Sequence, residues 1–296
     1  MGIISAEKYS VVYAGRDVIE NKNVTVNVLN DELLMNDKFK RVFKNEIKAV
    51  AVLSHSNISK LFDVCFGERM HYIVSEYLVG NSLEDFLLKS TLELNEILHL
   101  VAKILGALQY AHDKGISHGN ISPQNVILKK DGEVKIINFG LAKAFSVVDK
   151  EHEYNPYINY QKDNLGLAQT DIYCVGRMLK DMLIETTPGK GNENDNFDSL
   201  QTGIKQIILK ATESNFLNRY STAEEMLDDI LAYKKNPNIV FRHDVIKSDM
   251  NSATEKYAAE RKSREWQSKG VCQFCGGDFK GLLVKKCEKC GKKKSY

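Results

Sequence analysis

The sequence of 296 residues lacks several features that would fix its class at once. It has no run of about 18 apolar residues, so nothing in it predicts a membrane span. It also lacks a basic start followed by an apolar segment, so we expect no signal peptide. With 43% hydrophobic and 27% charged residues, its composition is that of an ordinary globular protein. We therefore expect a cytoplasmic protein without a membrane partner.

Net charge is also low, at a formal value of +2, but the charge is unevenly spread. Residues 261–296 hold eleven Lys or Arg against three acidic residues, a net charge of +8 that leaves −6 for the preceding 260 residues. A basic end of this kind is typical of proteins with nucleic-acid or other acidic partners. It is equally compatible with a charged terminus that only adds solubility.

Cysteine is scarce, and four of the six cysteines gather near the end of the chain. Cys272 and Cys275 form one C-x2-C pair, Cys287 and Cys290 form a second, and each pair is followed by glycine. Two such turns supply the four thiolates of a tetrahedral site, which suits zinc, with a rubredoxin-like iron site as the rival. About 27 residues are too few for a core, so the metal would supply the folding free energy. The pattern predicts a zinc ribbon over residues 270–296.

The periodicity of apolar residues predicts strands first and helices later, which favours an α+β arrangement. Residues 187–198 are polar and rich in Gly and Asn, so we expect a surface loop there. Asp131-Gly132 between two apolar runs predicts a hairpin. Three parts are expected: a domain over residues 1–237, a polar and helical linker over 238–269 that holds the single tryptophan, and the ribbon. The expected strands are 9–13, 23–29, 58–64 and 71–77, and the expected helices are 39–53, 94–114, 171–184, 200–212 and 222–234.

Residues 3–235 resemble the Ser/Thr protein kinase family in a series of motifs that occur in the family's order. The resemblance implies a bilobal fold with a small β-rich lobe and a larger helical lobe. It also implies that Asp171 braces the catalytic loop. The matching segments are Val24-Thr25-Val26-Asn27 for V-A-I-K, Glu46 for the αC glutamate, His118–Asn125 for the catalytic loop, Asn138-Phe139-Gly140 for D-F-G, Asp171–Gly176 for the D-x-Y-S-x-G helix, and Arg219.

The departures from the family pattern fall on the charged groups that perform phosphoryl transfer. Asn27 replaces the phosphate-binding lysine, Asn120 the catalytic aspartate, Ser122 the loop lysine and Asn138 the metal-binding aspartate. An amide neutralises no charge and has no useful basicity near neutral pH. The three glycines of the phosphate loop are replaced by Ser5, Glu7 and Ser10.

Other positions of the family's site keep their residues. Glu46 and Asn125, the αC glutamate and the second metal ligand, are retained. We expect Glu46 to be solvated in the cleft or to have a new basic partner. The best alignment for the alanine-proline-glutamate segment is Asn159-Tyr160-Gln161, so Arg219 is expected to lack its usual glutamate. By resemblance, a vestigial nucleotide pocket would be lined by Val12, Thr25, Ser75, Glu76, Leu78 and Ile127, with weak or absent binding of Mg·ATP.

These substitutions predict a catalytically inactive pseudokinase that acts as a scaffold or regulatory protein for a protein partner, with the ribbon as a docking module. One alternative is an atypical ATP-dependent Ser/Thr protein kinase, which Glu46 and Asn125 favour. A second alternative is a nucleic-acid-associated adaptor that uses the basic ribbon. The sequence leaves the partner and the oligomeric state open.

Overall fold

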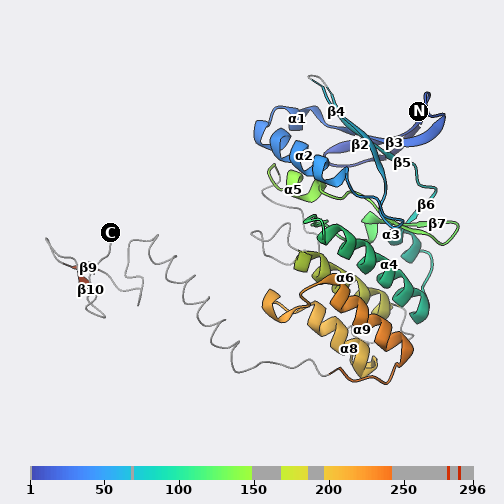
Figure 1. The fold of residues 1–296 in the computed structure, drawn as a ribbon, viewed down its shortest axis with the longest axis vertical. Coiled ribbons are helices and arrows are strands. Elements are labelled where there is room, and N and C mark those ends of the chain that lie inside the picture. The colour runs from blue at the N-terminus through green and yellow to red at the C-terminus, as the bar shows by residue number, and fades with distance from the viewer. Residues whose placement is uncertain are drawn as a thin grey trace. The chain divides into compact units, whose positions relative to one another are not determined.

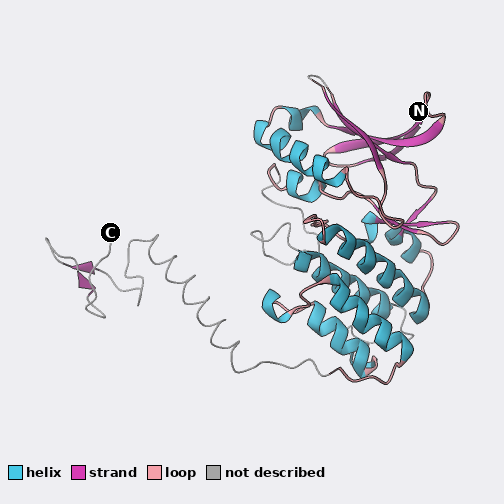
Figure 2. Ribbon diagram, viewed as in Figure 1, coloured by secondary structure: helices cyan, strands magenta, loops and turns pink. Residues whose placement is uncertain are grey.

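The computed structural model describes residues 2–67, 70–148, 168–185, 197–241, 279–280 and 286–287. The chain divides into two units, residues 1–241 and 242–296, and each is described by itself. In the first unit a lobe of antiparallel strands is followed by a lobe of helices, as Figures 1 and 2 show. No helix within the described ranges is both long and apolar enough to cross a membrane.

The first lobe is built on a five-stranded sheet. Its strands are arranged in the order β1-β2-β3-β5-β4, and every neighbouring pair is antiparallel. Alternating valines on β3 are typical of such a strand. The prediction missed β1 and placed β4 too early, because Ile58 forms only an isolated parallel bridge with Ile136. The strands are β1 (Gly2–Ala6), β2 (Ser10–Asp17), β3 (Lys22–Leu29), β4 (Leu61–Phe66) and β5 (His71–Glu76).

Helix α2 (Asp37–Val50) follows the short α1 (Asp31–Leu34) and packs its apolar side against the sheet. Asn36 caps it, since its side-chain oxygen accepts the Phe39 N–H. Phe39, Phe43 and Ile47 form the buried stripe and meet Ile73 of β5. Burying each such side chain contributes about 1.5–3 kcal/mol, so this stripe fixes the helix on the sheet.

The helical lobe encloses the larger core. The apolar sides of its long helices α4, α6, α8 and α9 are buried against one another. Figure 2 shows these helices stacked below the sheet. The elements are β6 (Gly80–Ser82), α3 (Leu83–Leu87), α4 (Leu94–His112), η1 (Pro123–Asn125), β7 (Val126–Lys129), β8 (Val134–Ile136), α5 (Leu141–Phe145), α6 (Ala168–Glu185), α8 (Thr202–Ala211), η2 (Phe216–Asn218) and α9 (Ala223–Lys235).

The β7–β8 hairpin connects the two lobes. Asp131 and Gly132 form its turn as predicted, and Gly132 has a φ of 82°, which favours glycine. Beyond the hairpin, the Ser59 N–H donates to the Ile136 carbonyl at 2.9 Å, and the Ile136 N–H donates to the Asn57 carbonyl at 2.8 Å. The segment before β4 is therefore joined to β8 through backbone hydrogen bonds.

The second unit contains one described element pair. Strand β9 (Phe279–Lys280) is antiparallel to β10 (Lys286–Cys287), and Cys287 lies opposite Phe279. Cys272, Cys275 and Cys290 lie outside the described residues, as do the tryptophan and residues 242–269 of the expected linker. The four-cysteine metal site therefore stays a prediction.

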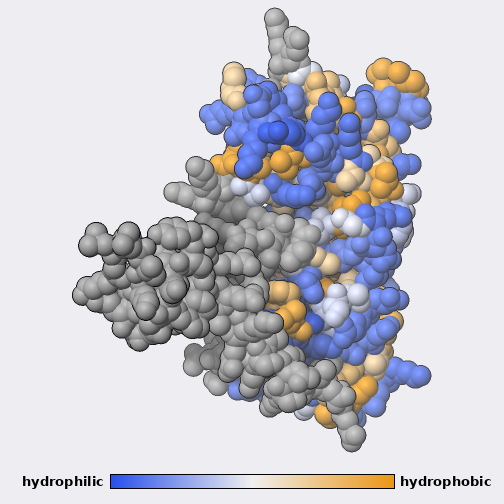
Figure 3. Space-filling model, turned by 60° about the vertical axis from the view of Figure 1, so that its left-hand side comes forward, coloured by the Kyte–Doolittle hydropathy of each residue, from blue (hydrophilic) through white to orange (hydrophobic). Residues whose placement is uncertain are grey.

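The surface of the first lobe is mainly polar on the face that Figure 3 presents. Hydrophilic residues cover much of it, and hydrophobic patches lie between them. Exposed single apolar side chains are normal on a soluble domain and need no partner. The functional argument therefore starts from the buried polar groups.

Candidate functional site

Four of the residues expected around the nucleotide share one face of the sheet. In the antiparallel register, Val12 lies opposite Asn27, and Thr25 lies opposite Ser75. Directly opposed residues project to the same side, and side chains two apart on a strand do as well. Asn27 also lies opposite Ile73, which packs against α2, so this is the face that α2 covers.

Asn27 occupies a buried position without a full set of hydrogen bonds. Only 8% of the residue is exposed, and its Oδ1 atom has no hydrogen-bond partner in the described part of the chain. Buried acceptors are normally satisfied, so an orphan of this kind needs an explanation. Asn27 lies where the resemblance expects a phosphate-binding lysine, so a hydrogen-bond donor or a cation would satisfy its Oδ1 atom.

Glu46 has a basic partner that the sequence did not identify. Its Oε1 atom lies 2.5 Å from Nζ of Lys143, which belongs to α5. The expectation of a solvated Glu46 without a partner is therefore wrong. The Lys143 side chain is 55% exposed, so the pair contributes at most about 1 kcal/mol to stability. The lysine can leave the glutamate at little cost.

An aromatic stack joins α5 to the turn between β1 and β2. The Phe145 ring lies 5.1 Å from the ring of Tyr9 and 5.8 Å from the ring of Phe39, both in stacked geometry. Tyr9 belongs to the segment that replaces the family's glycine-rich loop. Helix α5 therefore holds this turn against α2.

The loop that contains Asn120 is held by one buried carboxylate. Asp171 accepts the backbone N–H of His118 at 2.8 Å and that of Gly119 at 2.7 Å. The same side chain lies 2.8 Å from Nε2 of His112. Asp171 therefore braces the loop, as the resemblance implies.

The buried side chain of His118 connects this loop to Phe139. Its ring meets Phe139 edge-on at 4.6 Å, and its Nε2 atom lies 2.8 Å from the Ile137 carbonyl. Burial lowers the pKa of His118, against smaller opposing effects of Asp171 and the Ile137 carbonyl. Next to Phe139, Gly140 has a φ of 75°, and a Cβ there would lie 2.7 Å from Cγ2 of Val50. Only glycine suits this close approach.

Neutral amides replace the charged centre of the family's site and hydrogen-bond to one another. Asn138 Nδ2 donates to Asn125 Oδ1 at 2.9 Å, and Asn125 Nδ2 donates to the Asn120 carbonyl at 2.9 Å. Asn125 Nδ2 also lies 3.3 Å from Ser122 Oγ. Asn138 has a φ of 66°, a left-handed conformation that asparagine tolerates. The two expected metal ligands are therefore already bonded to each other.

The remaining residues of the expected nucleotide pocket lie around the end of β5. The Thr25 hydroxyl donates to the Glu76 carbonyl at 3.4 Å. Leu78 follows β5 and Ile127 belongs to β7, and both are half-buried. The Glu76 side chain projects to the opposite face from Ser75, because side chains alternate along the strand. Only the backbone of Glu76 can therefore contact a ligand in the cleft.

Arg219 binds backbone carbonyl groups in the part of the chain that the structure describes. Its guanidinium donates to the Glu213 carbonyl from Nε and Nη2, at 3.2 and 2.7 Å, and from Nη1 to the Gln169 carbonyl at 2.6 Å. Backbone carbonyls of the described residues therefore bind this guanidinium, and the expectation that Arg219 lacks its usual glutamate stays a prediction. The aligned segment Asn159-Tyr160-Gln161 lies outside the described residues.

Comparison with known proteins agrees with this geometry. The family model described as the protein kinase domain matches residues 4–243, so the chain belongs to the protein kinase family. The kinase domain of PknI from Mycobacterium tuberculosis has the same fold, with a TM-score of 0.64, 20% identity, and coverage of 78% of this chain and 94% of that chain.

Two curated relatives are named as kinases. A probable serine/threonine-protein kinase of Clostridium perfringens is 31% identical over 257 residues, which are 78% of this chain and 37% of the relative. Serine/threonine-protein kinase PrkC of Bacillus subtilis is 28% identical over 243 residues, 74% of this chain and 38% of the relative. The chain therefore spans less than half the length of these relatives.

These relatives overturn the prediction of an inactive scaffold. Both curated relatives are named serine/threonine protein kinases. The prediction gave the lost charges more weight than the retained Glu46 and Asn125. The findings favour the alternative, an atypical ATP-dependent kinase.

Proposed function

We propose that this chain is an atypical ATP-dependent Ser/Thr protein kinase. The observation that carries the proposal is the loop of Asn120 and Asn125, which Asp171 braces and which meets Asn138 at 2.9 Å. Glu46 also keeps a lysine partner in Lys143. The names of the relatives support the same reaction. The implied partner is a protein with a Ser or Thr acceptor.

In this proposal the face of the sheet that carries Val12, Thr25 and Ser75 receives the adenine. Lys143 is the cation that pairs with Glu46, so it is the candidate for contact with phosphate. Asn120 orients the acceptor hydroxyl by hydrogen bonding but accepts no proton. A general base contributes about 10²- to 10⁴-fold to a rate, so we expect turnover slower than that of an aspartate-containing kinase by this factor.

Magnesium is the group that the family implies, and the donors here suit it poorly. Asn125 and Asn138 offer two neutral amide oxygens, whereas a hard divalent cation prefers carboxylates. Asn125 Oδ1 is also occupied by the Asn138 amide. The residues do not fit a tightly held Mg²⁺, and we derive no step through the metal.

Transfer of radiolabelled phosphate from ATP to the protein and to Ser/Thr peptides tests the proposal. Wild type should incorporate label above a heat-killed control, Asn125→Ala should abolish the signal, and Asn120→Asp should raise it. Asn23→Ala, an exposed asparagine on β3, is the matched control and should leave the signal unchanged. If neither wild type nor Asn120→Asp incorporates label, the proposed activity is refuted.

We further propose that Cys272, Cys275, Cys287 and Cys290 hold one zinc ion. The β9–β10 pairing between the two cysteine pairs supports a ribbon, since it joins the two turns. Elemental analysis should give about one zinc per chain, the stoichiometry of one four-thiolate site. Cys287→Ser together with Cys290→Ser should remove it, while Cys65→Ser should not. Iron in place of zinc would contradict the assignment.

A further inference from the structure

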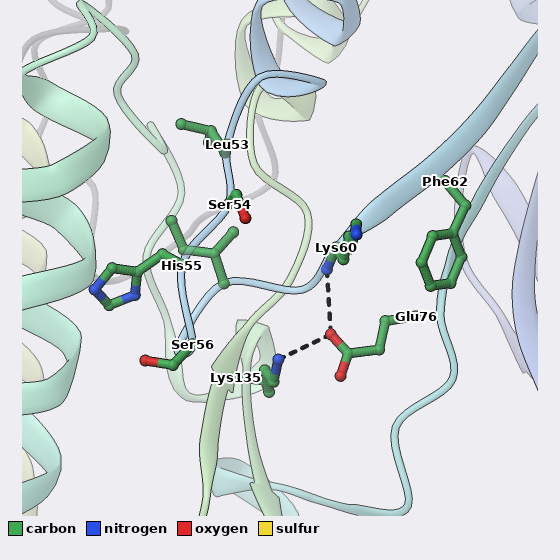
Figure 4. A pocket seen from close by; sticks show the side chains of 9 residues that line it. Leu53, Ser54, His55, Ser56, Lys60, Phe62, Glu76 and Lys135 are labelled. Atoms are coloured by element: carbon green, nitrogen blue, oxygen red, sulfur yellow. Dashed lines mark hydrogen bonds and ion pairs between the residues drawn. The ribbon is translucent and has the colours of Figure 1, made fainter.

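A pocket of about 410 Å³ lies behind the end of β5 and is separate from the face expected to receive a nucleotide. Its polar lining comes from Ser54, His55, Ser56, Lys60, Glu76 and Lys135. Figure 4 shows the Glu76 carboxylate between the backbone of Lys60 and the Lys135 side chain. Glu76 lies opposite Val24 in the register, on the other face from Thr25 and Ser75.

The pocket already binds one carboxylate of the chain itself. Oε2 of Glu76 accepts a hydrogen bond from Nζ of Lys135 at 2.9 Å and from the Lys60 backbone N–H at 3.2 Å. Lys135 is only 8% exposed, so this ammonium is largely withdrawn from water and needs an anion. The charge of Glu76 is thereby used to neutralise Lys135.

The other polar groups around the pocket are donors without an acidic partner. The Lys60 ammonium makes no ion pair with any residue that the structure describes, and it lies 5.9 Å from the ring centroid of Phe62. Lys22 lies 3.9 Å from the centroid of the same ring. The pocket itself therefore carries two lysines against one glutamate, and the nearby Lys22 adds to its positive field.

His55 and Ser54 add neutral donors, whereas the Ser56 hydroxyl already donates to Asn57 Oδ1 at 3.4 Å. Nδ1 of His55 accepts the Asn57 N–H at 3.0 Å, so the neutral ring carries its proton on Nε2. Burial, and then the charge of Lys135, lower the pKa of His55, which keeps the ring neutral near pH 7. The hydroxyls of Ser54 and Ser56 complete the lining.

We propose that this pocket binds a phosphate monoester, with Lys60 as its principal charge contact. A phosphate monoester carries close to two negative charges at pH 7 and three acceptor oxygens. It can therefore accept bonds from one ammonium and several neutral donors at once, while Glu76 keeps Lys135. The group can be a phosphorylated side chain of a peptide or free phosphate. This inference does not depend on phosphotransfer by the chain.

The pocket and the nucleotide face are joined through Glu76, so a ligand bound in the pocket should change the NMR signals of residues at that face. The Glu76 N–H donates to the Lys60 carbonyl at 2.9 Å, and the Glu76 carbonyl accepts the Thr25 hydroxyl. A ligand held by Lys60 therefore acts on the same residue, Glu76, whose carbonyl borders the nucleotide face. Backbone amides of residues 54–60 and of Glu76 are the natural reporters.

Amide NMR spectra of the full ¹⁵N-labelled chain, titrated with O-phosphoserine, inorganic phosphate and serine, test the proposal. Saturable shifts are expected at residues 54–60 and 76 with either phosphate source and not with serine. Lys60→Met keeps the backbone N–H and should weaken binding about fivefold, the upper range for one exposed ion pair, since Lys60 is exposed. Lys89→Met, another exposed lysine, should not weaken it.

The two phosphate sources separate the possible ligands. Stronger binding of O-phosphoserine assigns the site to phosphorylated peptides, and stronger binding of inorganic phosphate assigns it to a free anion. The basic segment 261–296 can also bind phosphate, but Lys60→Met would leave that binding intact. Shifts at residues 54–60 and 76 that survive unchanged in Lys60→Met, or the absence of shifts at these residues in the wild type, overturn the proposal.

Discussion

Replacing Asp171 by asparagine should destabilise the domain strongly, although the two side chains have the same shape. The carboxylate is fully buried and accepts from two backbone N–H groups through different oxygens, with His112 on one of them. An asparagine keeps only one of these oxygens. Its NH₂ group would then face a backbone N–H of His118 or Gly119, and that donor would stay unsatisfied.

The magnitude follows from the bonds that are lost. A buried donor without a partner costs about 1–3 kcal/mol, and a hydrogen bond to a charged acceptor contributes about 1.5–3 kcal/mol. Asp171→Asn should therefore lower the free energy of unfolding by about 3–5 kcal/mol. Because a domain is stable by only about 5–15 kcal/mol, the loss is a large fraction of the total.

Urea unfolding followed by circular dichroism measures this effect as a shift of the midpoint at unchanged slope. Asp113→Asn is the matched control, since Asp113 is exposed and accepts only from the Gln109 side chain. The control should change stability by less than about 0.5 kcal/mol. A loss below about 1 kcal/mol for Asp171→Asn would refute the view that this carboxylate is the acceptor on which the loop depends.

Three other perturbations test the site. Phe145→Ala removes a half-buried ring, so it should lower the free energy of unfolding by about 1–2 kcal/mol and speed hydrogen exchange at the backbone amides of Tyr9 and its neighbours. Unchanged exchange at these amides would contradict the stacking argument. Asn138→Asp removes the donor to Asn125 and adds a charged oxygen. The melting temperature should therefore be lower without Mg²⁺ and should recover when Mg²⁺ is added. A melting temperature that does not depend on Mg²⁺ would contradict this view of Asn138. Burial lowers the pKa of His118 in the fold, so its contribution to stability is complete above the unfolded pKa of about 6.5 and is lost as the pH falls below it. The urea midpoints of His118→Gln at pH 5 and pH 7 should therefore differ less than those of the wild type. An equal difference would exclude His118 as a source of the pH dependence of stability.

Local signals in the sequence predicted the elements that depend on local interactions. The apolar period over residues 94–114 predicted α4, and Asp131-Gly132 predicted the hairpin of β7 and β8. Strand β1 was missed because most of its residues are exposed and its short sequence has no alternating pattern. The alternation of apolar and polar residues that identifies a strand arises when one face of the strand is buried. This edge strand has no buried face.

Long-range partners left no comparable signal. Lys143 and Glu46 lie far apart in the chain, and a charged residue on a short helix gives no indication of its partner. Arg219 uses backbone carbonyls, which every residue possesses, so composition could not identify them. The family motifs located the positions of the site, but only the register placed Glu76 on the opposite face from Ser75.

The amide network explains how the charged centre could change while the fold stayed the same. A side-chain amide can both donate and accept hydrogen bonds. Asn125 uses both capacities, because its Oδ1 accepts from Asn138 and its Nδ2 donates to the backbone carbonyl of Asn120. Packing around Phe139 and the brace from Asp171 do not depend on those charges. Likeness of fold therefore says little about turnover, which depends on proton transfer and charge neutralisation. The substitutions act on the rate of the proposed reaction, and the response to Asn120→Asp measures how much of that rate a single carboxylate restores.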